Sequence, residues 1–428
     1  MKPVCWIDEG VIMLLSFRVA NVLSFRDEQC LSFVATDLHE GSVRATRVRE
    51  QGRHLAVVPV IGIFGANASG KSNSLSALSS MRDAVLGSLG WLSEPSPVRR
   101  TPFALDPEFA GRPSFYEADL ILGDGVRYTY GFEIDDRSVR GEWLHAYPKG
   151  RKQVWYDRRG EDEIEFPGEG LRGEKLELAR RVRPDALFLG VAAQFNHEQI
   201  LPVFEWFRDN LRLISPEKAK FEGEPRTDRR VLSDPKFRDR VAKVLQLADL
   251  GITGFDRVAL AEGEIRLLHR AGATEVALDF GRESWGTRSW FALLGTLLDA
   301  LDEGTVVLVD ELDASLHPIM SAEAIRMFQD PEVNPLGAQM AFTSHDATLL
   351  YSLLGSERVL DRGTLWLTEK RSDGATDLYP LTSVNPPPRK DDNLFRKYLL
   401  GLYGGVPHVS SGTLAANLVP HDVSGLSV

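Results

Sequence analysis

The sequence predicts an α/β fold that also carries an antiparallel β-subdomain and a helical insert. Three observations predict this fold. An apolar run over residues 56–64 leads into a Gly-rich loop and then an amphipathic helix, a pattern typical of α/β proteins. Two later apolar strands, which begin at Val306 and Met340, end in an Asp-Glu pair and in a histidine. Residues 114–157 alternate apolar and polar side chains, which indicates antiparallel strands with one buried face.

Composition excludes several classes of protein. The chain has 428 residues, 43% of them hydrophobic and 26% charged, which is average for a globular protein of two or three compact units. Its formal net charge of −11 excludes binding to nucleic acid or to an anionic membrane by bulk attraction. Only two cysteines occur, which excludes a disulfide framework and a thiolate metal site and favours the cytoplasm. No apolar run approaches the roughly 18–20 residues that span a bilayer, so we expect no membrane partner.

The elements around the Gly-rich loop follow from apolar spacing. Apolar and polar residues alternate within 14–34 on both sides of a polar interruption, which predicts two short strands. The denser run at 56–64 predicts one buried strand. The helix after the loop places four apolar side chains on one stripe, namely Leu75, Leu78, Met81 and Val85.

The middle of the chain has an antiparallel strand pattern, then a helical pattern, and then a mixture of strands and helices. The antiparallel pattern turns at Gly-Asp-Gly 123–125 and at Pro-Lys-Gly-Arg 148–151. From 174 to 250 the sequence becomes helical and polar, and we expect one helix with Trp206, Phe207 and Leu211 and another with Val241, Val244 and Leu245. The remaining expected elements are strands within 255–280, a helix at 288–301, strands at 364–369 and 377–381 and a helix at 394–402.

We expect five units along the chain. They are a disordered extension (1–12), a first lobe with the Gly-rich loop and the antiparallel strands (13–173), the helical insert (174–250), a second lobe (251–407) and a mobile tail (408–428). Met13 is the more natural start, because strand-like sequence begins there. Within the insert, residues 212–243 hold ten basic and six acidic side chains. This basic region is interpreted either as a solvated helical surface or as a face that binds nucleic acid or a partner.

The Gly-rich loop matches the phosphate-binding motif G-x-x-x-x-G-K-[ST]. Its glycines let backbone N–H groups wrap around a β-phosphate, and the dipole of the following helix adds to the attraction. Lys71 is expected to bind the β- and γ-phosphate oxygens, and the Ser72 hydroxyl to ligate Mg²⁺. The cofactors predicted are ATP and Mg²⁺, since the chain lacks the Asn-Lys-x-Asp motif of GTPases. The predicted nucleotide-binding residues are Gly65, Ala66, Asn67, Ala68, Ser69, Gly70, Lys71, Ser72 and Asn73.

Three polar residues at the ends of the later strands are candidates for catalysis. The carboxyl ends of strands are where α/β sheets bind ligands. We expect Asp310 to hold Mg²⁺ and Glu311 to act as the general base on the attacking water. His345 is expected to contact the γ-phosphate, although a lone histidine at a strand end is more often structural or on the surface.

A second anion-binding segment precedes the helix at 288–301. Residues 283–287, which we call the signature segment, read Glu-Ser-Trp-Gly-Thr. A serine hydroxyl, backbone N–H groups and a helix dipole together attract an anion. The ordinary alternative is a helix N-cap at Ser284. The chain's own nucleotide site does not obviously need a second such surface.

Along the chain, the motifs occur in the order phosphate loop, signature segment, Asp-Glu pair and histidine. In this order they resemble the motifs of ATP-binding-cassette ATPases, in the branch of chromosome-maintenance and double-strand-break-repair heads. More closely, the chain resembles bacterial AAA-type ATPases of the RloA/AbiLii kind, relatives of the overcoming-lysogenization-defect ATPases, which are associated with abortive infection and phage defence. The segments that carry the resemblance are LLSFRVANVLSFRDEQCLSF, GANASGKSN, ESWGTRS, VLVDELDASLHP, FTSHD and YLLGLYGGVP. The resemblance implies a P-loop NTPase of the ABC-ATPase head type.

The resemblance also implies an ATP-dependent homodimer or higher oligomer in which each phosphate loop faces the signature segment of the other copy. Ser284, Gly286 and Thr287 would then contact the γ-phosphate in trans. Asp313 would lie in the loop that couples the two sites, and His345 would be the switch histidine.

Other implied positions match the family pattern less well. Gln194 is the candidate for a Mg²⁺-sensing glutamine. Trp285 replaces the small or polar residue that is usual in the signature segment. Leu23 and Leu402 stand where many relatives have basic residues.

The function expected from this resemblance is an ATP-hydrolysing switch that acts with a separate effector, a nuclease or a toxin, in phage defence. The alternative is an ATP-gated DNA- or RNA-binding protein without its own effector. An intrinsic nuclease is disfavoured because no Asp-x-Asp pair follows His345. The antiparallel strands disfavour a transporter ATPase subunit, and the intact Glu311 disfavours a binding module without turnover.

Overall fold

The computed structural model describes most of the chain. The described residues are 5–6, 10–36, 41, 43–50, 52–93, 100–160, 163–214, 225–248, 251–314, 316–351 and 358–407. The tail expected at 408–428 lies outside them. The extension expected at 1–12 is partly described, and there Cys5–Trp6 form a short strand, β1, parallel to β4 (Arg44–Glu50). That part of the extension is therefore paired rather than disordered.

A six-stranded sheet organises the α/β part of the molecule. Its strands, in spatial order, are β12 (Leu211–Ile214), β16 (Val306–Val309), β17 (Gln339–Thr343), β6 (Val60–Gly65), β18 (Leu365–Lys370) and β19 (Thr376–Pro380). All neighbours pair in parallel except β18 and β19. The carboxyl ends of β6, β16 and β17 therefore meet at one edge of the sheet.

A seven-stranded antiparallel sheet forms the predicted β-subdomain. Its order is β11 (Glu163–Glu165), β10 (Gln153–Arg159), β9 (Val139–Ala146), β8 (Arg127–Ile134), β7 (Ser114–Ile121), β2 (Met13–Ala20) and β3 (Gln29–Ser32). The predicted antiparallel strands are confirmed. The two expected N-terminal strands are also present, and they extend this sheet because β2 pairs with β7.

Two small sheets and eleven helices complete the described part of the chain. The small sheets are β1 with β4 and β5 (Arg53–Val57), and β13 (Ile252–Phe255) with β14 (Arg266–Ala271) and β15 (Thr274–Asp279). The helices are α1 (Lys71–Gly87), α2 (Pro107–Ala110), α3 (Lys175–Ala179), α4 (Phe188–Gln194), α5 (Leu201–Asp209), α7 (Pro225–Ser233), α8 (Pro235–Leu247), α9 (Arg257–Ala261), α10 (Trp285–Glu303), α11 (Pro318–Gln329) and α12 (Leu394–Leu399). The strand expected over 56–64 is two strands, because the chain turns at Pro59 between β5 and β6.

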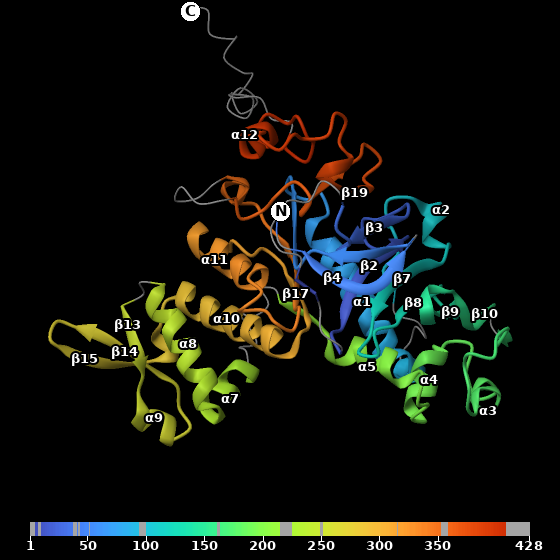
Figure 1. Ribbon diagram of the computed structural model, residues 1–428, viewed down its shortest axis with the longest axis horizontal. Coiled ribbons are helices and arrows are strands. Elements are labelled where there is room, and N and C mark those ends of the chain that lie inside the picture. The colour runs from blue at the N-terminus through green and yellow to red at the C-terminus, as the bar shows by residue number, and fades with distance from the viewer. Residues whose placement is uncertain are drawn as a thin grey trace, which may run out of the picture.

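Helix α1 lies between the two large sheets. Its predicted stripe, Leu75, Leu78, Met81 and Val85, is buried. The stripe shares one core with Tyr130 of the antiparallel sheet and with Ile61 and Leu308 from one face of the parallel sheet. Phe342 and Val307, on the opposite face, pack with α10 and α11. The antiparallel sheet and the β13–β15 sheet consequently lie on opposite sides of the molecule (Figure 1).

Residues 174–250 are not one separate helical layer. Trp206 and Phe207 are buried on α5, which packs on α1, but Leu211 begins strand β12 instead of continuing that helix. The chain leaves the helix at Asn210 and becomes the edge strand of the parallel sheet. Farther along, Val241 and Leu245 of α8 are buried in the same core as α10, while Val244 is half-buried.

One buried carboxylate joins the antiparallel sheet to α4. Glu142 of β9 is fully buried and accepts hydrogen bonds from the backbone N–H groups of Phe188 and Leu189, at 2.6 and 2.9 Å. The hydroxyls of Tyr130 and Tyr156 also donate to it, at 3.2 and 3.0 Å. Both N–H groups belong to the first turn of α4, so Glu142 holds the start of that helix against the sheet.

No helix in the described ranges combines the length and the apolar character that a membrane-spanning helix needs.

Candidate nucleotide-binding site

The phosphate loop, residues 65–72, joins the end of β6 to the start of α1. Gly70 precedes the helix with φ of 107°, a left-handed conformation that favours glycine. The Lys71 Nζ donates to the carbonyl oxygens of Gly65 and Ala66, at 2.9 Å each. Burial lowers the pKa of Lys71, and the negative charges of Asp313, Glu311 and Asp310 act in the opposite direction. The loop is thus folded around its own ammonium group.

Strand β18 supports the loop from behind. A Cβ atom at Gly65 would lie 2.3 Å from the Thr368 Oγ1 and 2.7 Å from the Thr368 carbonyl oxygen. Only glycine fits at that distance from a neighbouring backbone. The Thr368 hydroxyl is also hydrogen-bonded to the Ser69 hydroxyl, at 2.6 Å. Sequence analysis did not identify Thr368, because no motif surrounds it.

A second support comes from the loop between β2 and β3 and from β19. The Asn73 side-chain amide donates to the Ser24 Oγ at 2.8 Å. The Thr376 hydroxyl donates to the Ser69 carbonyl oxygen at 2.9 Å and lies 2.8 Å from the Ser24 Oγ. Residues from the N-terminal and the C-terminal parts of the chain therefore fix the position of the phosphate loop.

The predicted acidic pair follows β16, next to the end of β17. The Thr343 hydroxyl donates to the Asp310 Oδ1 at 2.6 Å and accepts from the Glu311 N–H at 2.7 Å. Glu311 adopts φ of 53°, a left-handed conformation that is unfavourable for a residue with a side chain. The buried hydroxyl of Thr343 therefore fixes both acidic residues, a role that sequence analysis did not assign to it.

The structure brings His345 and Asp313 to the same place. The His345 Nε2 lies 3.8 Å from the Glu311 Oε1, and the two side chains are 40% and 36% exposed. The His345 N–H donates to the Asp313 Oδ1 at 3.1 Å. Because β16, β17 and β6 are parallel neighbours in the sheet, the predicted phosphate loop, acidic pair and histidine converge on one partly open site.

The candidate metal ligands here, Ser72 and Asp310, offer oxygen atoms. No group of three or more His, Cys, Asp and Glu side chains that fits a metal ion occurs in the ranges that the structure describes. Mg²⁺ does not need one, since it keeps several waters and takes one or two protein oxygens together with phosphate oxygens. The Ser72 hydroxyl and the Asp310 carboxylate are oxygen donors of this kind.

The signature segment lies at the start of α10. The exposed Ser284 caps the helix, since its Oγ accepts from the Thr287 N–H at 3.1 Å. The predicted N-cap is therefore present. Helix α10 has 19 residues and is about 28 Å long, while β16 runs for only about 13 Å. The segment that contains Ser284, Gly286 and Thr287 consequently begins well away from Asp310 of the same chain.

The structure does not bring Gln194 to this site. Gln194 is the exposed last residue of α4. The start of α4 contacts Ser88, because the Leu187 N–H donates to the Ser88 Oγ, and Ser88 follows the far end of α1 from the phosphate loop. Helix α1 is about 25 Å long and α4 about 10 Å, so α4 is too short to reach the loop.

Three arginines of the basic region are paired with acids from another element. Arg212, Arg230 and Arg240 form ion pairs with acids in the second half of α10, namely Asp299, Asp302 and Glu303. Arg238 donates to the Val231 carbonyl oxygen at 2.9 Å. Part of the region, including Lys218 and Lys220, lies outside the described residues. The three paired arginines therefore do not form a free positive surface, whereas Lys236 and Lys243 of the same region are exposed.

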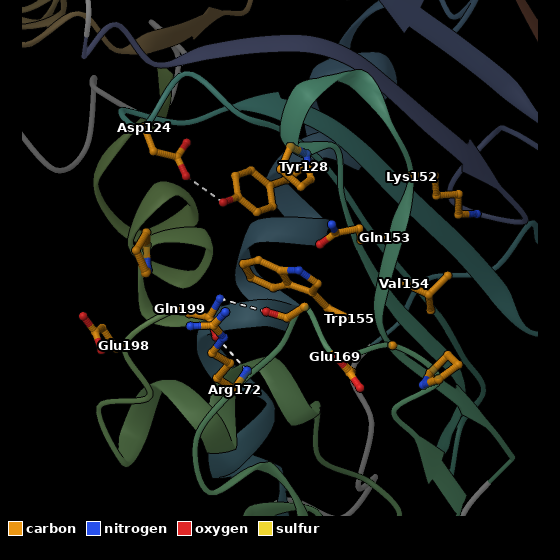
Figure 2. A pocket seen from close by; sticks show the side chains of 15 residues that line it. Asp124, Tyr128, Lys152, Gln153, Val154, Trp155, Glu169, Arg172, Glu198 and Gln199 are labelled. Atoms are coloured by element: carbon orange, nitrogen blue, oxygen red, sulfur yellow. Dashed lines mark hydrogen bonds between the residues drawn. The ribbon is translucent and has the colours of Figure 1, made fainter.

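A large cavity of about 1050 Å³ opens on the antiparallel sheet, outside the phosphate loop. Figure 2 shows that Trp155 and Tyr128 lie in it and that the Tyr128 hydroxyl donates to Asp124, at 2.7 Å. Its charged lining is mixed, with Lys152 and Arg172 beside Asp124, Glu169 and Glu198. The cavity contains none of the residues that sequence analysis predicted for the site.

Comparison with known proteins gives one family and several distant structures. The model of the family described as "AAA domain, putative AbiEii toxin, Type IV TA system" matches residues 60–350. No curated protein matches the chain.

The similar solved structures share little sequence with this chain. The Smc head bound to the C-winged helix domain of ScpA is 13% identical and covers 86% of this chain and 96% of its own, with a TM-score of 0.38. RecF with ATP, from the RecFOR pathway, is 15% identical with coverages of 87% and 99% and a TM-score of 0.35. CbiO1 from Clostridium perfringens, part of the ABC transporter complex CbiONQ, is 12% identical with coverages of 92% and 96% and a TM-score of 0.31.

Proposed function

Because this chain belongs to the family of AAA domains described as putative AbiEii toxins of type IV TA systems, we propose that it is an ATPase that works as a molecular switch. It hydrolyses ATP to ADP and phosphate with Mg²⁺. Two copies enclose the nucleotides head to tail, and hydrolysis releases the pair. The observation that carries the proposal is the convergence of Lys71, Asp310, Glu311 and His345 on one open edge of the parallel sheet.

The chain's own residues have distinct tasks in this reaction. The Lys71 ammonium group gives up its hydrogen bonds to the loop carbonyl oxygens and donates to the β- and γ-phosphate oxygens instead. Glu311 accepts a proton from the attacking water, and His345, 3.8 Å from it, contacts the γ-phosphate. Ser72 and Asp310 would hold Mg²⁺, which would offset the negative charge on the phosphates.

Replacing Thr343 by valine is expected to lower the ATPase rate about tenfold, because Asp310 and the Glu311 N–H each lose a buried hydrogen bond. Phosphate release under saturating ATP measures the effect. Thr305→Val is the matched control: Thr305 is buried at the other end of β16, and its Oγ1 has no hydrogen-bond partner among the described residues. Equal rates in the two variants would remove Thr343 from the site.

The dimer is supported by the exposed start of α10. Ser284 is exposed and lies at the N-terminus of a 19-residue helix, where an anion is stabilised. Asp310 and Glu311 of the same chain lie well away from Ser284, because α10 is much longer than the strand β16 that follows it. A phosphate brought by a second copy would meet this surface without any change in the first copy's own loop.

Replacing Ser284 by arginine is expected to block ATP-dependent dimerisation while ATP still binds the monomer. The long side chain would occupy the space that the second copy's nucleotide needs. Light scattering after size exclusion, with and without ATP, measures the association, and equilibrium dialysis measures ATP binding. Ser383→Arg, which changes another exposed serine, is the control. A Ser284→Arg protein that still dimerises normally would refute the trans assignment.

The biological role we propose is regulation of a separate effector, a nuclease or a toxin, in abortive infection or phage defence. The family description and the resemblance to RloA/AbiLii ATPases support it. The alternative of ATP-gated DNA or RNA binding needs a positive surface. Within the described part of the basic region, Arg212, Arg230 and Arg240 are paired with acids, so we favour a protein effector.

A further inference from the structure

A histidine of the β13–β15 sheet is hydrogen-bonded to the signature segment. The His269 Nε2 on β14 lies 2.6 Å from the Glu283 Oε1. Glu283 immediately precedes the cap Ser284, and its side chain is only 4% exposed, whereas that of His269 is 26% exposed. A buried carboxylate thus lies next to the N-terminus of α10, and an imidazole from another element contacts it.

The other charged groups at this corner have different partners. On β14, Arg266 pairs with Asp279 of β15 at 2.8 Å and with Glu264 at 2.9 Å. On α10, the Arg288 guanidinium lies 5.7 Å from the centre of the Trp285 ring. Arg282 is exposed. Strand β13 contributes Ile252 opposite His269. His269 is therefore the side chain whose hydrogen bond orients the Glu283 carboxylate.

The position of this carboxylate matters for an incoming anion. The N-terminus of a helix attracts phosphate, but a negative side chain one residue before the cap repels it when its oxygens face the same space. A buried carboxylate also needs a hydrogen-bond donor to remain buried. The hydrogen bond to the His269 Nε2 meets the second need, and it directs the Glu283 Oε1 toward β14.

We propose that the His269–Glu283 hydrogen bond positions the signature segment to receive the γ-phosphate of the ATP bound to a second copy. The inference rests on the proposed function and names a positioning pair within it. His269 acts through Glu283 and does not touch the nucleotide.

Replacing His269 by alanine is expected to raise the ATP concentration for half-maximal dimerisation about tenfold, as for the loss of one hydrogen bond to a charged group. Binding of ATP to the monomer stays unchanged, because Lys71 and Asp310 are untouched. His269→Gln keeps an N–H donor near the same place and is expected to restore most of the response. The double variant with Glu283→Ala should be no worse than either single variant.

The experiment is light scattering against ATP concentration in the full chain, with equilibrium dialysis for ATP binding and calorimetry for the melting temperature. His54→Ala, which changes a hydrogen-bonded histidine on β5, is the matched control. Dimerisation of His269→Ala at the normal ATP concentration would overturn the inference. So would an equal loss in His269→Ala and His269→Gln with a lowered melting temperature, since that would show a role in folding only. Unchanged protein that stays monomeric in a non-hydrolysable ATP analogue would overturn the proposed function itself.

Discussion

Replacing Glu311 by glutamine is expected to lower the rate of ATP hydrolysis by about 10²- to 10⁴-fold. Glutamine has the same shape as glutamate but does not accept a proton from water. The hydrogen bond to Thr343 is made by the backbone N–H of residue 311, so the replacement leaves it in place. ATP binding, which depends on the phosphate loop, is expected to remain.

Two measurements test this expectation together. Phosphate release gives the rate, and light scattering in ATP gives the oligomeric state, because a protein that binds ATP without hydrolysing it should accumulate as dimers. Glu332→Gln, which changes an exposed glutamate, is the control. Hydrolysis at the normal rate in Glu311→Gln would remove this residue from the mechanism, whatever the state of association.

Replacing Glu142 by alanine is expected to lower the free energy of unfolding by about 3–5 kcal/mol. The change leaves the N–H groups of Phe188 and Leu189 buried without their acceptor and removes the acceptor of two tyrosine hydroxyls. The Arg158 guanidinium also loses its buried counter-charge, 3.9 Å away. Helix α4 would then detach from the antiparallel sheet at lower denaturant concentration.

Urea unfolding followed by circular dichroism measures this loss. Glu163→Ala, on β11 of the same sheet, is the control because residue 163 is exposed, and its effect should stay within about 0.5 kcal/mol. Glu142→Gln keeps an oxygen acceptor and should fall between the two. A loss below about 1 kcal/mol in Glu142→Ala would show that water replaces the carboxylate in a relaxed structure.

Local patterns predicted the elements of this fold well. The stripe of α1, the antiparallel strands and the strands that precede Asp310 and His345 were all visible, because each depends on spacing within a short window. The common location of the candidate residues was predictable for a similar reason: the ends of parallel strands converge at one edge whatever lies between them.

The supports of the site were not predicted. Thr368 and Thr376 lie about 300 residues from the loop that they hold, and nothing in their own surroundings distinguishes them from other threonines. Their effect comes from hydroxyls placed by the sheet order, in which β18 pairs with β6. A single sequence does not contain that order.

The differences from these expectations arise because the path of the chain in space is not contained in local sequence patterns. Leu211 continues the apolar pattern of α5 but belongs to β12, since the chain changes direction at Asn210. The basic region was counted without the acids of α10, which follow about 60 to 90 residues later and pair with it. Gln194 was assigned from the resemblance, and the placement of α4 separates it from the loop.

The path from α10 to β16 has a consequence for how the two ATP molecules of the proposed dimer would be consumed. Ser284 lies at one end of this continuous rod, and Asp310 and Glu311 come directly after the strand that follows its other end. Ion pairs of Asp299 and Asp302 with Arg230 and Arg240 hold the second half of this helix against α7 and α8. A displacement of the cap by one nucleotide would therefore be transmitted toward Glu311, which accepts the proton of the water that attacks the other nucleotide. We therefore expect ATP hydrolysis by the two active sites to be cooperative, with a Hill coefficient for ATP above one.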